Sequence, residues 1–124
     1  MQKILWLALA GALGTLARYG LGGFVQRNAS LSFPWGTMVV NLSGCFLFGL
    51  VWSLAERRVA ISGEIRTILL IGFMGAFTTF STFMFETGEF LRDGEWMWAA
   101  TNLLGQNVLG IVFLFIGLAL GRLL

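Results

Sequence analysis

Residues 71–86, in the third of four long apolar segments, combine weak helix formers with hydroxyl and aromatic side chains. After Gly72 and Gly75 the two kinds of side chain interleave, in Phe77, Thr78, Thr79, Phe80, Ser81, Thr82 and Phe83. Because glycine and β-branched threonine both disfavour helix, we expect a helix break near Gly75, at the middle of the segment. Within a bilayer, non-helical backbone is tolerated only where protein buries it or it lines a cavity, and such breaks commonly hold ions. The stretch therefore predicts an ion site.

Four polar side chains in or beside the apolar segments need an explanation. Arg18 is either an interfacial arginine that extends to the headgroups or a positive charge at a pore mouth. Asn41 is either a hydrogen-bonding link between helices or an amide donor that faces a permeating anion. Glu86 is either a solvated helix end or a vestibule carboxylate that steers an ion. Gln106 adds a polar group near the middle of the fourth segment.

The composition is that of a membrane protein. Of 124 residues, 57% are hydrophobic and 11% are charged, against the roughly 25% charged residues of a soluble domain. Cys45 is the only cysteine and histidine is absent, which excludes a disulfide framework, a thiolate metal cage and a histidine base. No nucleophile elbow or phosphate-binding loop occurs, and a net charge of +2 does not indicate nucleic acid. We therefore expect neither an enzyme nor a nucleic-acid-binding protein.

Four segments are long and apolar enough to cross a bilayer: residues 4–24, 35–54, 65–85 and 96–120. Tryptophans fall near the ends of these segments, where amphipathic rings prefer the membrane interface: Trp6, Trp35, Trp52, Trp96 and Trp98. The first segment lacks a cleavage site of small residues, so we interpret it as a retained helix. The sequence thus predicts an all-α membrane protein with one integral membrane domain, residues 1–124, four transmembrane helices and a broken third helix.

The basic residues give the chain little preference for one orientation in the membrane. Both termini and the middle linker, on one side, carry five of them: Lys3, Arg57, Arg58, Arg66 and Arg122. The opposite side carries three: Arg18, Arg27 and Arg92. Five against three is a weak bias for the rule that basic residues favour the cytoplasmic side, so we expect insertion in both orientations. Four helices form a thin bundle for a pore, and no internal repeat is evident, so we expect an antiparallel homodimer.

Two motifs resemble those of the small bacterial fluoride channels, the Fluc or CrcB family. Residues 72–83 are similar to the signature of that family's third helix, and residues 33–41 are similar to its loop into the second helix. Arg18 stands where the family has a first-helix arginine, and the resemblance covers nearly the whole chain. The chain departs from the pattern at Ala76, where glycine is often found, and at Met84 and Gly110, where serine occurs in the family.

The resemblance implies a fluoride-selective channel, a dual-topology homodimer that passively exports fluoride across the bacterial plasma membrane and so lowers cytoplasmic fluoride. It also implies a structural sodium ion at the dimer centre, held by the backbone carbonyls of Gly75 and Thr78. Along the fluoride pathway it implies two phenylalanines whose ring edges point at the ion, with amide, hydroxyl and charged side chains nearby. These pathway residues are Arg18, Asn41, Thr79, Phe80, Thr82, Phe83, Glu86 and Gln106. The implied partners are fluoride, a second copy of the chain and membrane lipid.

Elementary chemistry is compatible with fluoride conduction, and two other functions remain as alternatives. The positive edge of an aromatic ring accepts an anion without a formal charge that would trap it, although periodicity alone favours packing roles for the phenylalanines. A small multidrug-type proton-coupled exporter would share the size and the inverted pairing, but it usually needs an acid at mid-membrane, and all six acids fall near span ends. A structural subunit of a larger membrane complex would need no mid-depth polar groups such as Asn41 and Gln106.

Overall fold

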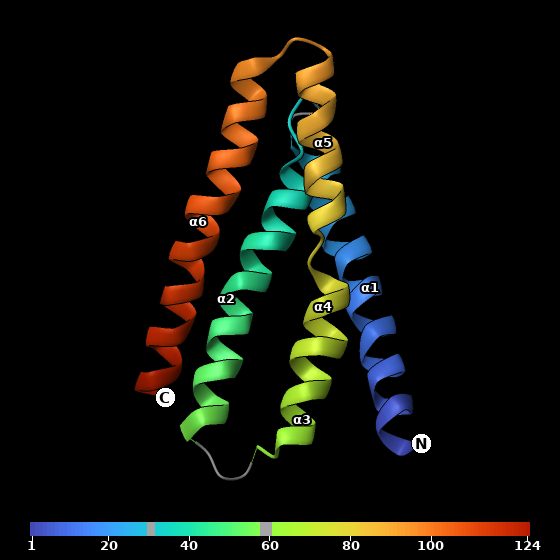
Figure 1. Ribbon diagram of the computed structural model, residues 1–124, viewed down its shortest axis with the longest axis vertical. Helices are drawn as coiled ribbons and strands as arrows, with labels where there is room; N and C mark the ends of the chain where they lie inside the picture. The colour runs from blue at the N-terminus through green and yellow to red at the C-terminus, as the bar shows by residue number, and fades with distance from the viewer. Residues whose placement is uncertain (30–31, 58–60) are drawn as a thin grey trace.

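The computed structural model describes residues 1–29, 32–57 and 61–124. Four helical spans are long and apolar enough to cross a membrane: Gln2–Asn28, Trp35–Glu56, Gly63–Arg92 and Trp96–Leu123. Both termini, the end of the second span and the start of the third lie at one end of the molecule (Figure 1). The expected number of four long apolar helices is therefore confirmed. Arg58, one of the five basic residues counted above, lies outside the described residues.

The first, second and fourth spans are continuous helices, whereas the third span is built from several pieces. The continuous helices are α1 (Gln2–Asn28), α2 (Trp35–Arg57) and α6 (Trp96–Leu123). The pieces of the third span are α3 (Gly63–Thr67), the π-helix η1 (Ile68–Met74), α4 (Gly75–Phe77) and α5 (Phe80–Arg92). The π-helix was not predicted from the sequence. Such segments are rare and occur frequently at functional sites.

The break in the third span is confirmed, but it lies at Thr78 and Thr79 and not at Gly75. Gly75 has helical backbone angles (φ −62°, ψ −32°), whereas Thr78 and Thr79 have extended ones (ψ 158° and 109°). Threonine is well suited to this place because its hydroxyl can replace a missing backbone partner. The Thr79 hydroxyl accepts a hydrogen bond from the Thr82 amide at 3.3 Å and so caps the first turn of α5.

Glycines bring the backbones of α2 and α6 into direct contact. A methyl group on Gly117 of α6 would overlap the Phe46 carbonyl oxygen of α2, and one on Gly49 would overlap the Leu114 carbonyl oxygen. Gly121 is also buried against α2, so glycines line the contact between the two helices. Backbone atoms cannot rotate away as a side chain can, and these contacts therefore fix the spacing of the two helices.

Gly117→Ala should destabilise the protein by about 1–3 kcal/mol, because the added methyl group overlaps the backbone of α2. The matched control is Gly20→Ala on α1, where nothing lies within 4 Å of the new methyl group and alanine is the better helix former. Thermal unfolding in detergent should give a lower midpoint for Gly117→Ala and an unchanged or higher one for Gly20→Ala. Equal midpoints would show that α2 and α6 do not pack this closely.

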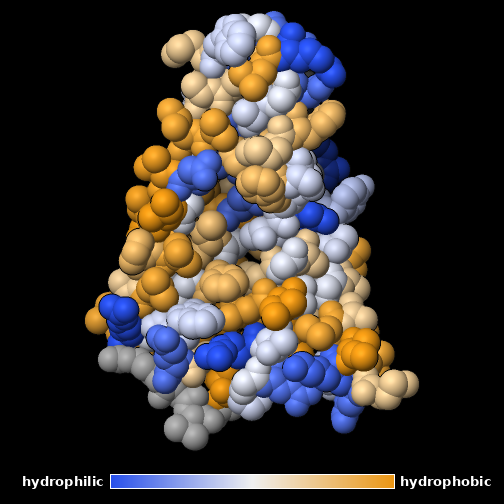
Figure 2. Space-filling view, in the orientation of Figure 1, coloured by the Kyte–Doolittle hydropathy of each residue, from blue (hydrophilic) through white to orange (hydrophobic). Residues whose placement is uncertain are grey.

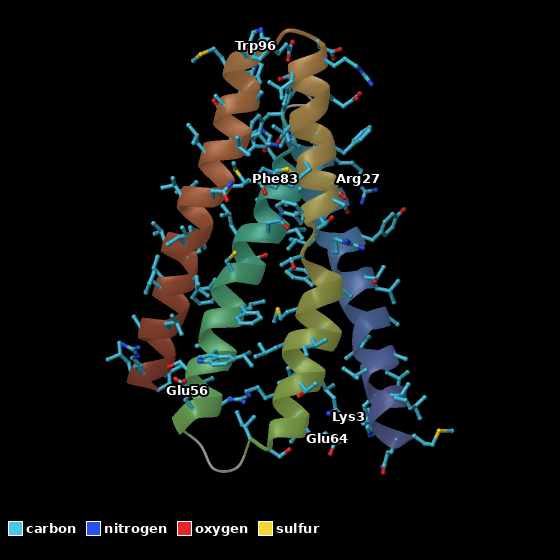
Figure 3. The ribbon with its side chains drawn as sticks, viewed as in Figure 1. Lys3, Arg27, Glu56, Glu64, Phe83 and Trp96 are labelled. Carbon is cyan, nitrogen blue, oxygen red and sulfur yellow. The ribbon has the colours of Figure 1, made fainter. Side chains whose placement is uncertain are left out.

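The ends of the molecule carry the aromatic and charged residues expected at a membrane interface. At the end opposite the termini, the Phe33 ring lies 4.7 Å from Trp35 and 5.4 Å from Trp98, measured between ring centroids. At the other end, the Arg66 guanidinium lies 5.0 Å from the centre of the Trp52 ring. Figure 3 shows Lys3, Glu56 and Glu64 gathered at the end with the termini and Trp96 at the opposite one.

Between these ends the outer surface is largely hydrophobic. Figure 2 shows hydrophobic residues over much of the middle of one face, with hydrophilic residues along its lower edge and at its upper right. The exposed apolar side chains include Leu16 of α1 and Phe115 of α6, which are 65% and 63% exposed. By contrast, the buried core is small and centres on Val40, Leu70 and Phe77. Such a surface fits lipid or further protein, not water.

Candidate ion pathway

The break in the third span is closed by Asn41 of α2. Its Oδ1 accepts a hydrogen bond from the Thr79 amide at 2.8 Å, and its Nδ2 donates to the Thr79 carbonyl at 3.1 Å. A side-chain amide thus pairs with the backbone where the helical ladder stops, and it satisfies groups that would otherwise lack partners. Gly44, nearly one turn further along α2, allows this approach, because a methyl group there would overlap the Thr78 side chain.

The remaining hydrogen of the Asn41 amide is also used. Nδ2 donates to Oε1 of Gln106 on α6 at 2.8 Å, so Asn41 links α2, α6 and the break. The helix-linking interpretation of Asn41 therefore describes this structure, and neither of its N–H groups is free to face an anion. The structure brings Asn41 and Gln106 together as the predicted pathway requires, but as partners of each other.

Two further polar residues extend this contact, and the sequence analysis did not select them. Gln106 Nε2 donates to Asn102 Oδ1 at 2.8 Å, and Asn102 Nδ2 donates to the Thr87 hydroxyl at 2.9 Å. The four-residue spacing of Asn102 and Gln106 places both on one face of a helix, which is a signal that could have identified Asn102. Asn107 is equally polar but turns outward and donates to the carbonyl of Leu103.

A cavity of about 430 Å³ gathers much of the predicted pathway. It is lined by Asn41, Thr79, Phe80 and Phe83, together with Gly75. The two rings lie edge to face, with centroids 6.0 Å apart and planes at 67°. Their surroundings differ, because Phe83 is 5% exposed and lies inside the bundle near mid-length (Figure 3), whereas Phe80 is 73% exposed. One ring therefore belongs to the core of the chain, and the other is presented outward.

A second cavity, of about 560 Å³, brings together residues from α1, α2 and the third span. Arg18, Thr37, Thr79, Thr82 and Glu86 are among the residues that line it. The Thr37 hydroxyl donates to Glu86 Oε1 at 2.5 Å. The other carboxylate oxygen of Glu86 is buried and has no hydrogen-bond partner among the described residues. Glu86 is thus half-buried in a cavity wall, and its interpretation as a solvated helix end is wrong. The sequence analysis did not identify Thr37 as its hydrogen-bond partner.

The hydroxyls of Thr79 and Thr82 lie together, as expected, but they bond each other. Thr79 Oγ1 donates to Thr82 Oγ1 at 2.8 Å. Thr79 is buried and lines both cavities, so it stands between them. Further along α6, Gly110 is buried, and a methyl group there would lie 3.5 Å from the Cys45 sulfur. The buried polar face of α6 therefore does not continue from Gln106 toward the C-terminus.

Gly75 and Thr78 present backbone carbonyls at the end of α4. In a continuous helix the Thr79 amide would bond the Gly75 carbonyl, but here it donates to Asn41. Gly75 is exposed, and apart from its chain neighbours and its own helix backbone no described residue has an atom within 4 Å of the position that a side chain would occupy. Carbonyl oxygens at the C-terminal end of a half-helix are suitable ligands for sodium. In the described residues no group of three or more acidic, cysteine or histidine side chains offers another metal site.

Four apolar spans, the third of them broken, define a small multi-pass membrane protein. Residues 5–118 match the family model described as CrcB-like protein, Camphor Resistance (CrcB), and the chain belongs to this family.

Three relatives from bacteria carry the name fluoride-specific ion channel FluC. The chain is 61% identical to the one from Nitrosococcus oceani, over 99% of this chain and 98% of that protein. It is 58% identical to the one from Desulforapulum autotrophicum, with the same coverage, and 55% identical to the one from Solidesulfovibrio magneticus, over 100% of this chain and 99% of that protein. The expectation of a multi-pass bacterial membrane channel and not an enzyme is thereby confirmed.

Proposed function

We propose that the chain is a fluoride-specific channel that passively exports fluoride across the bacterial plasma membrane. The observation that carries this proposal is the cavity at the helix break, where Asn41 and Thr79 meet Phe80 and Phe83 and where none of the described lining residues is charged. Uncharged ring edges can attract an anion without holding it so tightly that it cannot leave. The relatives named as fluoride-specific channels over their full length support the choice of ion.

The route runs through the two cavities and passes the break. An ion entering beside Arg18 meets a positive charge, then the Thr37–Glu86 pair, and reaches Thr79, which lines both cavities. Beyond Thr79 it meets the ring edges of the phenylalanines. The Glu86 carboxylate would repel an anion, so its bond to Thr37 and the nearby Arg18 charge reduce the barrier at this point.

A growth assay tests this function in a cell. In a bacterium that lacks its own fluoride exporter, expression of the chain should restore growth in medium that contains fluoride. Expression of Asn41→Leu at the same level in the membrane should not restore it. Failure of the well-expressed parent chain to protect the cells would overturn the assignment.

The carbonyls of Gly75 and Thr78 would hold a structural sodium ion where two copies of the chain meet. The fit rests on the Gly75 carbonyl, which lacks the Thr79 amide as partner, and on the open space around Gly75. A bound cation would neutralise the partial negative charge at the ends of two facing half-helices. It would take no part in transport.

Replacing sodium by a bulky organic cation should lower both the unfolding temperature of the purified protein and its fluoride flux. A ligand present at 100 times its dissociation constant stabilises the folded state by about 2.7 kcal/mol, so the shift should be readily measured. Thermal unfolding and liposome flux in sodium-free buffer check this. Unchanged stability and flux after thorough sodium removal would exclude the site.

The second copy of the chain would pair in the antiparallel orientation. Phe80 is 73% exposed and Gly75 is exposed, so both the ring pair and the sodium site are incomplete in a single chain. An antiparallel partner would cover them and provide a second, equivalent route. Epitope tags at either terminus should report both orientations in one membrane, and a single orientation for every molecule would rule out this dimer.

A further inference from the structure

A buried row of polar side chains starts at the helix break and runs along α6. Asn41 Nδ2 donates to Gln106 Oε1 at 2.8 Å, Gln106 Nε2 donates to Asn102 Oδ1 at 2.8 Å, and Asn102 Nδ2 donates to Thr87 Oγ1 at 2.9 Å. Gln106, Asn102 and Thr87 are 6%, 0% and 6% exposed. Groups shut off from water to this degree must bond one another, because a buried amide without a partner is costly.

The break fixes the direction in which this row points. Asn41 must turn Oδ1 to the Thr79 amide and Nδ2 to the Thr79 carbonyl, because a backbone N–H can only donate and a carbonyl can only accept. Its second N–H then points at Gln106, which has to present an oxygen. Each amide further along must be turned the same way, with its oxygen toward the break and its nitrogen away from it.

The far end of the row is not fixed in this way. The Thr87 hydroxyl accepts from Asn102 and donates to the Phe83 carbonyl at 2.8 Å. That carbonyl is already the acceptor of the Thr87 backbone amide, four residues on in α5. A hydroxyl can rotate to donate in another direction, and Phe83 would keep its helical hydrogen bond if it did. The Thr87 end of the row can therefore be reversed without leaving a polar group there unbonded.

We propose that the row reverses when fluoride reaches Asn41, so that Gln106 becomes a second donor to the ion; this rests on the proposed function. In the reversed row, Thr87 donates to Asn102 Oδ1, and Asn102 Nδ2 donates to Gln106 Oε1. Gln106 Nε2 then faces the break, where one N–H of Gln106 and one of Asn41 converge on the fluoride ion. No covalent bond changes, and every proton stays on its own atom.

The ion supplies the free energy for this reversal. Without an anion, the reversed row would point two N–H groups at each other, so the observed direction is preferred. With fluoride between them, both N–H groups donate to a charged acceptor, and hydrogen bonds of this kind are roughly twice as strong as neutral ones. A ligand shifts such an equilibrium only through its different affinity for the two states, and fluoride has that difference here. When the ion leaves, the row returns to its original direction.

Side-chain amide resonances of the ¹⁵N-labelled full chain in lipid nanodiscs test the proposal. Addition of fluoride should shift the amide signals of Asn41, Gln106 and Asn102 with one common concentration dependence, and chloride should not. Asn107 serves as the control on the same helix, because its amide is exposed and bonds Leu103. If fluoride shifts Asn41 and Gln106 but leaves Asn102 unchanged, the row does not reverse.

Variants of Thr87, at the far end of the row, distinguish a reversal of the row from a row with one fixed direction. Thr87→Val removes the hydroxyl that accepts from Asn102 in the observed row and donates to it in the reversed one, so the coupled response of Asn102 to fluoride should be lost and flux should fall about tenfold. Thr87→Ser restores the hydroxyl and should restore both. A fluoride response of Asn102 in Thr87→Val equal to that of the parent chain would overturn the proposal. A parent chain that passes no fluoride refutes the channel function itself, whereas one that passes fluoride while Asn102 stays silent refutes only the reversal.

Discussion

Asn41→Leu should lower fluoride flux per folded protein by about 100-fold, a loss equivalent to about 2.7 kcal/mol. Leucine has a similar size but offers no hydrogen bond, so the Thr79 amide, the Thr79 carbonyl and Gln106 all lose the partner they have in the structure. Each buried polar group left without a partner costs about 1–3 kcal/mol. Flux from liposomes, divided by the amount of folded protein from size-exclusion chromatography, checks this.

Asn107→Leu is the matched control for this change. It makes the same substitution in a membrane span, but Asn107 is exposed and bonds the Leu103 carbonyl of its own helix. Its flux should stay within about twofold of the parent chain, since exposed substitutions away from special features usually cost less than 0.5 kcal/mol. Equal flux for Asn41→Leu and Asn107→Leu would show that the hydrogen bonds between Asn41 and the helix break have no part in conduction.

Phe80→Met and Phe83→Met should each lower fluoride flux by at least about tenfold while the protein stays folded. Methionine roughly fills the volume of phenylalanine, so a packing role predicts only a mild effect. It has no ring edge, however, and the loss of an interaction worth about 1.4 kcal/mol already lowers a rate tenfold. The structure strengthens this test for Phe80, which is 73% exposed and therefore contributes little to the packing of its own chain.

Each of these two residues has a matched control of similar exposure. Phe77, which is 4% exposed, is the control for Phe83, which is 5% exposed. Phe85, which is 66% exposed, is the control for Phe80, which is 73% exposed. Phe77→Met should act through stability, and Phe85→Met should do little to flux per folded protein. Small and equal losses in all four variants would assign the rings to packing.

The class, the spans and the existence of a break could be predicted because they depend on local composition. An apolar run of about 20 residues has to be a helix in a bilayer, and tryptophan marks its ends. The glycines and threonines of residues 72–82 have low intrinsic helix propensity, whatever the rest of the chain does. The same local reasoning favoured Gly75 as the break, although the chain breaks at Thr78 and Thr79, where hydroxyls and Asn41 can replace lost backbone bonds.

What sequence reasoning missed depends on contacts between distant parts of the chain. Thr37 and Glu86 are 49 residues apart, and Asn41 and Gln106 are 65 apart, yet both pairs are hydrogen-bonded. Asn102 and Asn107 have the same side chain and lie in the same helix, but one is fully buried and the other is exposed. Their difference is set by which face of α6 meets α2 and α5, and that requires the assembled bundle.

Efflux of fluoride and of chloride from liposomes that contain the purified chain tests the central claim most directly. Ion-selective electrodes would follow each anion after the internal solution is loaded with equal concentrations of both. We expect rapid fluoride efflux, and chloride efflux no faster than from protein-free liposomes. Equal efflux of the two anions, or no fluoride efflux from folded protein, would contradict the assignment of a fluoride-selective route past the broken third helix.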